Sequence, residues 1–196
     1  MRKLAILFGG AALLAACQNN PPAPPAAAVA VDPNNPLMAL GYMEMAGSSD
    51  QFEIQSSQLA LQASQNPMLR NFAKMLIADH TRSTQMVVAT AQSAGLTPPP
   101  PTLLPQHQAM LDQLRAAGTG PSFDMAFQQM QVTAHQEALT LHQNYAASGD
   151  VPALRTVAGQ IVPVVQGHLQ QAQSMQVAAP PPPPAMPSTG RSGERG

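Results

Sequence analysis

Cysteine, charge and aromatic side chains are all scarce in this chain of 196 residues. It contains one cysteine, no tryptophan and only 10% charged residues, against an average of about 25% for globular proteins. A single cysteine excludes a disulfide framework and a cysteine-based zinc finger. A formal net charge of −1 supplies no basic excess for neutralising phosphates, so we expect no nucleic-acid partner.

Signatures of common enzyme classes are missing as well. The chain has no phosphate-binding P-loop, no G-x-S-x-G nucleophile elbow and no H-E-x-x-H zinc motif. Ser83 lies one helical turn from His80, but no glycine-rich turn accompanies it to bind an oxyanion. We therefore assign no enzymatic activity, and a hydrolase is the weakest hypothesis.

Residues 1–16 have the pattern of a secretory signal peptide. Two cations precede an apolar run that is too short to span about 30 Å of hydrocarbon as a helix. The run ends in Leu-Ala-Ala-Cys, which resembles the bacterial lipobox and implies cleavage before Cys17 and its lipidation. The alternative is an incidental cysteine beside an ordinary cleavage site. Because Gln18 rather than aspartate follows, we expect an outer-membrane lipoprotein facing the periplasm, with the membrane as its partner.

Proline-rich segments flank a helix-forming centre. Residues 17–35 predict an extended tether, and residues 178–196 predict a disordered tail or a ligand for a proline-recognising module. Residues 36–177 are rich in Ala, Gln, Met and Leu, which favour helices, and no sustained alternation predicts a strand.

Apolar residues recur at helical spacing in four segments of this centre, and the connector between the second and the third has room for a short helix. The predicted helices span 36–64, 67–94, 106–117, 122–147 and 151–177. Pro163 lies inside the last helix, where we expect a kink. Two helical hairpins joined by a long crossover predict an all-α, antiparallel four-helix bundle with ferritin-like connectivity.

Glu53, His80, His135 and His168 lie near the middle of four different predicted helices. Counted from the turns at about 1.5 Å per residue, Glu53 and His80 differ in height by about 3 Å, and His135 and His168 by about 6 Å. The four side chains can therefore converge on one level of the bundle interior. Imidazole and carboxylate together suit a zinc, copper or iron ion, which makes a metal site one interpretation.

Three further residues are expected to support such a site from behind its ligands. They are Asp79, which can orient a ring nitrogen, and Asp124 and His142, which share a helix face with His135. The alternative is a structural polar layer, in which the histidines bond to carboxylates or backbone and hold the helices in register. A third interpretation places the histidines at surface edges.

Twelve methionines raise the question of a thioether copper site. Met43 and Met45 are the one tight pair, and residues two apart on a helix do not face each other. Six of the twelve methionines lie on apolar stripes, where methionine fills gaps: Met38, Met45, Met75, Met86, Met130 and Met175. We therefore interpret the methionines as core residues.

Four short motifs occur in order along the chain. They are Glu53-Ile54, the segment 72–80 that ends in Asp79-His80, Phe123-Asp124 followed by His135, and Pro163 followed by His168-Leu169. In order and spacing they resemble the bacterial outer-membrane protein family of domain of unknown function 4142, over roughly residues 45–175. The resemblance implies a ferritin-like bundle, a secreted or lipid-anchored location and no established activity.

A di-iron centre is not expected despite the ferritin-like connectivity. Di-iron bundles carry Glu-x-x-His on two helices. The positions three residues before the three mid-helix histidines hold Ile77, Val132 and Val165. Any metal site here is therefore dominated by histidine.

Replacing Cys17 with serine is expected to release the protein from membranes, because serine lacks the sulfur that would carry the lipid. Cells that express the wild type and Cys17→Ser would be separated into membrane and soluble fractions, and the protein detected in each by immunoblotting. A serine variant that remains in the membrane fraction would contradict lipidation.

Overall fold

The computed structural model describes residues 34–177, and within these residues the chain forms five helices and no strand. The helices are α1 (Ala39–Ala63), α2 (Pro67–Ser93), α3 (Pro105–Ala116), α4 (Pro121–Ser148) and α5 (Pro152–Ser174). Every helix begins and ends within three residues of its predicted bounds. The predicted signal peptide, Cys17 and the tail lie outside the described residues, as does nearly all of the tether. None of the described helices is both long and apolar enough to cross a membrane.

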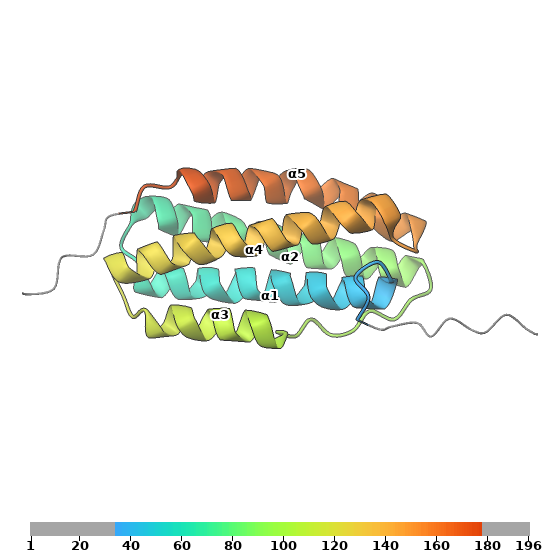
Figure 1. Cartoon of the computed structure of the whole chain (residues 1–196), viewed down its shortest axis with the longest axis horizontal. Helices are drawn as coiled ribbons and strands as arrows, with labels where there is room; N and C mark the ends of the chain where they lie inside the picture. The colour runs from blue at the N-terminus through green and yellow to red at the C-terminus, as the bar shows by residue number, and fades with distance from the viewer. Residues whose placement is uncertain (1–33, 178–196) are drawn as a thin grey trace, which may run out of the picture. The chain divides into compact units, whose positions relative to one another are not determined.

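Four of the helices form an antiparallel bundle (Figure 1). α1 packs against α2 and α4, and α5 packs against the same two helices. The chain runs in one direction along α2 and α4 and in the opposite direction along α1 and α5. This arrangement requires the connection between α2 and α4 to return along the bundle, and α3 lies in that connection, packed against α1. The all-α bundle with ferritin-like connectivity is confirmed.

Local signals in the sequence determine where the helices begin. Proline occupies the first turn of α2, α3, α4 and α5, where a missing N–H costs no helical hydrogen bond. Asn66 caps α2 by accepting a hydrogen bond of 3.0 Å from the backbone N–H of Met68. The Arg70 guanidinium donates to the carbonyls of Leu61 and Ser64 and so joins the start of α2 to the end of α1. α5 continues through Pro163 as one helix.

A polar layer divides the hydrophobic core into two clusters. One cluster contains Tyr42, Tyr145 and Leu154, and the other contains Phe72 and Phe127. Between them lie buried serine, aspartate, glutamate and histidine side chains from all four bundle helices. The mid-helix positions that the sequence singled out therefore lie in the interior rather than at surface edges.

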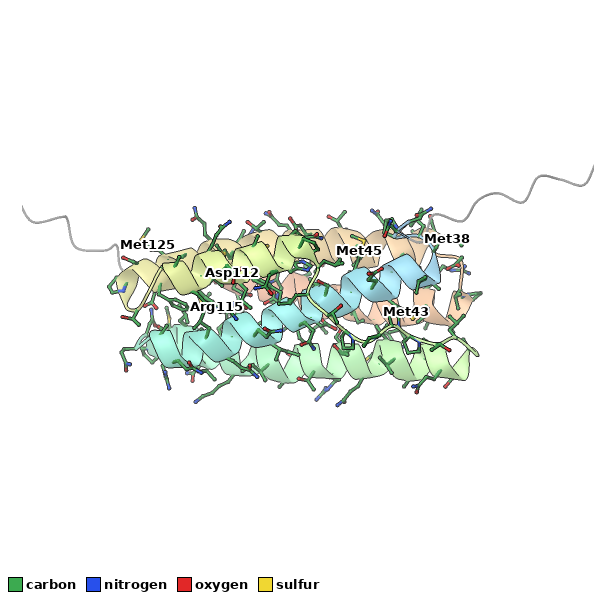
Figure 2. The ribbon with its side chains drawn as sticks, turned by 90° about the horizontal axis from the view of Figure 1, so that it is seen from below. Met38, Met43, Met45, Asp112, Arg115 and Met125 are labelled. Atoms are coloured by element: carbon green, nitrogen blue, oxygen red, sulfur yellow. The ribbon has the colours of Figure 1, made fainter. Side chains whose placement is uncertain are left out.

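Figure 2 labels side chains that lie in the core, at its edge and at the surface. Met43 is buried in the first cluster and Met45 packs against it, whereas Met125 at the start of α4 is exposed. Asp112 and Arg115 on α3 form an exposed ion pair of 2.7 Å. Exposed pairs of this kind contribute little to stability.

The turn after α4 leaves no room for a side chain at Gly149. A Cβ atom there would lie 2.6 Å from the Tyr145 ring. That ring is held in place by stacking on Tyr42, with ring centres 3.9 Å apart, and by a 2.9 Å hydrogen bond to Asp150. We expect Gly149→Ala to lower the free energy of unfolding by about 1–3 kcal/mol, the usual cost of overpacking.

Urea denaturation of the wild type and Gly149→Ala would measure this loss. Gly167→Ala is the matched control, because Gly167 lies within α5 and a Cβ atom there meets nothing within 4 Å. The control is expected to gain about 0.5–1 kcal/mol from the higher helix propensity of alanine. Unchanged stability in Gly149→Ala would show that the ring moves aside freely.

Candidate metal centre

His80, His135 and His168 come together at the centre of the polar layer, and we call them the histidine triad. They belong to α2, α4 and α5, and one ligand nitrogen from each ring lies within 4.8 Å of those from the other two. The ring centres are 5.5, 5.4 and 5.4 Å apart. Their side chains are 0–5% exposed.

The spacing of the rings suits a single metal ion. Bonds from nitrogen to metal are about 2.0–2.1 Å long, and the centre of an imidazole ring lies about 1.1 Å behind its nitrogen. Three rings directed at one ion would therefore have their centres about 5–5.6 Å apart. The observed separations fall in this range, so binding requires no large movement of the helices.

Each ring of the triad is held from behind by an acceptor. The contacts are His80 Nδ1 with Asp50 Oδ1 (2.8 Å), His168 Nε2 with Asp79 Oδ2 (3.1 Å) and His135 Nδ1 with the Gln131 carbonyl (2.8 Å). A carbonyl oxygen and an ionised carboxylate only accept hydrogen bonds, so the ring nitrogen donates its proton in each contact. These contacts fix the tautomer and the orientation of all three rings.

The opposite nitrogens of the triad face the interior. His80 Nε2, His135 Nε2 and His168 Nδ1 are buried and have no hydrogen-bond partner among residues 34–177. When all three rings are neutral, the outer nitrogens carry the protons and the inner nitrogens present lone pairs. An unpaired buried polar atom costs about 1–3 kcal/mol. The ligand nitrogens of the three rings lie within 4.8 Å of one another, so one cation bound between them would remove this cost.

The three rings differ in their affinity for protons. Burial lowers the pKa of His80, but the hydrogen bond to Asp50 and the charges of Asp50 and Glu53 outweigh burial, and the pKa is raised. Burial and the charge of His80 lower the pKa of His135 to about 3, and the same two causes lower the pKa of His168. The triad therefore accommodates one positive charge and resists a second.

Glu53 lies beside the triad and outside the group of clustered ligand atoms. Its Oε1 is 3.4 Å from His135 Nδ1, the outer nitrogen that contacts the Gln131 carbonyl. Both carboxylate oxygens are buried without a hydrogen-bond partner in the described part of the chain, and burial raises the pKa of Glu53 to about 7. α1 therefore directs its carboxylate toward the back of a ligand rather than toward the inner nitrogens.

The three residues expected to support the site lie in different places relative to the triad. Asp79 contacts His168 across the α2–α5 interface rather than the adjacent His80. His142 bonds through Nδ1 to the Tyr42 hydroxyl at 3.0 Å. Asp124 is buried eleven residues before His135, which is about 16 Å along the helix axis.

Sequence reasoning did not identify two residues that hold the triad. Asp50 accepts from His80 and also from the Thr84 hydroxyl at 2.8 Å. Its position three residues before Glu53 on one helix face was the available signal. Gln131 acts through its backbone carbonyl, for which its side chain supplies no signal.

The chain is similar to one family and to several solved structures. A family model described as "Domain of unknown function (DUF4142)" matches residues 22–175, which is most of the chain. Three similar structures are CopM in the Cu(II)-bound form (TM-score 0.58, 23% identity), CopM in the Ag-bound form by co-crystallization and CopM in the apo form (each TM-score 0.56, 21% identity). Each comparison covers 69% of this chain and 93% of the other. At these identities the likeness shows the fold alone. No curated protein matches the chain.

His142 makes the stability of the metal-free protein depend on pH. Burial lowers its pKa to about 4, below the ordinary value of about 6.5. The unfolded chain therefore binds more protons between these values, and stability is lost as the pH falls from about 6.5 to about 4. At about 1.4 kcal/mol per pH unit, His142 accounts for a loss of about 3 kcal/mol.

Urea denaturation between pH 7 and pH 4, with chelator present, would measure this loss in the wild type and in His142→Gln. Glutamine does not titrate, so the variant should lose about 3 kcal/mol less than the wild type over the same range. The comparison cancels the contributions of His80 and His135, which both proteins share. Equal losses would show that His142 is not buried as a neutral ring.

Proposed function

The chain belongs to the DUF4142 family, whose description names no function, and we propose that its histidine triad binds one transition-metal ion. The observation that carries this proposal is the set of three inner nitrogens that have no partner among the described residues. Their outer counterparts contact acceptors, so the lone pairs already point inward. This is the arrangement that a protein uses to orient histidine ligands.

A structural polar layer is the competing function. The outer hydrogen bonds of His80 and His168 join α2 to α1 and α5, and they hold the helices in register without an ion. A layer built only for register, however, gains nothing from three inward-facing nitrogens that lack partners. Each carries a cost of about 1–3 kcal/mol, and a bound cation removes all three costs together.

Copper is the ion that we propose first. Imidazole suits zinc, copper, iron and nickel, and the affinity of nitrogen sites for divalent ions is highest for Cu²⁺. The similar CopM structures are described as Cu(II)-bound and Ag-bound, which supports the same class of ion for this chain. A di-iron centre is not proposed, because the clustered ligand group contains three histidines and no carboxylate.

We further propose that the metal is bound in the cell envelope, by a protein lipidated at Cys17. The support is the sequence of residues 1–18, which lie outside the described part of the chain. An outer-membrane lipoprotein facing the periplasm would hold the ion outside the cytoplasm. With no catalytic motif in the sequence, we propose that the protein binds or holds the ion rather than using it in catalysis.

Removal of one triad ligand tests the function. The intact wild type is expected to bind about one equivalent of copper, and His135→Ala should weaken binding by more than the 10–100-fold typical for loss of a supporting residue. His142→Ala is the matched control, because it removes a buried histidine from the same helix outside the triad. Its affinity should stay within about threefold of the wild type. Elemental analysis and titration calorimetry would measure stoichiometry and affinity.

Circular dichroism would establish that both variants remain helical. Metal at 100 times its dissociation constant should also stabilise the wild type and His142→Ala by about 2.7 kcal/mol, and His135→Ala far less. If the wild type binds neither copper, zinc nor iron, the polar layer is structural. Equal losses in both variants would place the metal elsewhere in the protein.

A further inference from the structure

The acceptors behind the triad differ in their access to solvent. The side chain of Asp50 is 4% exposed and Gln131 is fully buried. The side chain of Asp79, which contacts His168, is 31% exposed. Among these three acceptors, Asp79 alone joins a triad histidine to the protein surface.

The opposite side of the site, along α1, is covered by the connection between α2 and α4. Ser48 Oγ lies 2.6 Å from His107 Nδ1 and ties α3 to α1. Pro101 packs on Gly47, where a Cβ atom would lie 3.3 Å from the proline Cβ. Prolines of the connection also wall a cavity of about 10 Å³ beside Asp50, which is room for about one water molecule. An ion therefore has no wide path to the triad from this side.

Apolar side chains close the site along the bundle axis. The Phe72 ring is fully buried, with its centre 6.4 Å from the centres of His135 and His168. Val165, three residues before His168, is buried in the other core cluster. A hydrated ion would lose its water against these side chains without compensation, which is prohibitively costly.

We propose that the ion enters and leaves the triad at the α2–α5 edge, where Asp79 captures it and His168 moves to admit it. This inference rests on the proposed metal binding. The Asp79 carboxylate can hold a hydrated cation at the surface, and release of His168 Nε2 frees the ring to turn. His80 and His135, held by buried acceptors, stay in place and receive the ion.

The local structure of α5 suits a moving ligand. Pro163 lies five residues before His168 and cannot donate the helical hydrogen bond to the Gly159 carbonyl, which weakens this turn. Val164 lies one turn before His168, on nearly the same face of α5, and is 44% exposed. α2 and α4, which carry the other two ligands, have no internal proline.

A matched pair of variants separates capture from orientation. Asp79 and Asp50 each hold one outer nitrogen, but Asp79 is partly exposed whereas Asp50 is buried. Asp79→Asn should lower the association rate constant for Cu(II) about tenfold, since surface charge changes such rates by 10-fold or more. Asp50→Asn should leave that rate constant within about twofold and raise the dissociation rate constant instead. Stopped-flow mixing of the intact protein with Cu(II) and an indicator chelator would measure both constants.

Two further variants test the same edge. Asp79→Glu keeps the charge and should associate at close to the wild-type rate. Val164→Trp should cover the edge and slow association and dissociation by similar factors, which leaves the dissociation constant within about threefold. This variant also supplies a result if Asp79→Asn does not fold.

The outcomes distinguish this inference from the proposed function. An association rate constant within twofold of the wild type in both Asp79→Asn and Val164→Trp would overturn the entry path while metal binding stands. Association slowed equally in Asp50→Asn and Asp79→Asn would overturn it as well. A wild type that binds no ion would instead refute the metal site itself.

Discussion

The burial of three imidazole rings in the middle of an otherwise apolar bundle is the constraint on which the structure depends. Each ring needs an acceptor behind it, and Asp50, Asp79 and the Gln131 carbonyl meet that need. The polar groups form a layer that divides the hydrophobic core into two clusters.

The supporting residues also assign different tasks to the bundle helices. α2, α4 and α5 carry the triad, whereas α1 supplies Asp50 and Glu53 to the backs of two rings. In the proposed entry path, the buried Asp50 holds His80 in place and the partly exposed Asp79 connects His168 with solvent. The carboxylate of Asp50 thus serves the affinity for the ion, and that of Asp79 serves the ion's access to the site, because the two differ in burial.

Helix positions and bundle type were predictable because they depend on local signals. Apolar spacing and the prolines at 67, 105, 121 and 152 mark helices whose bounds agree with the structure within three residues. The positions of His80, His135 and His168 were predictable to the level of one layer, because height follows from counting residues between turns. The rotation of each helix about its own axis was not predictable. This rotation places Glu53 beside His135 Nδ1 rather than among the clustered nitrogens.

The sequence by itself determined the order and length of the helices, the long crossover and which histidines lie at mid-helix, because these depend on periodicity and chain breaks. Only the tertiary structure decided the contact of Asp79 with His168, the role of Asp50 and the direction of the inner nitrogens. Those features depend on how two helices turn toward each other. The relative rotation of two helices is set by packing between residues 30 to 89 positions apart, and no local pattern encodes it.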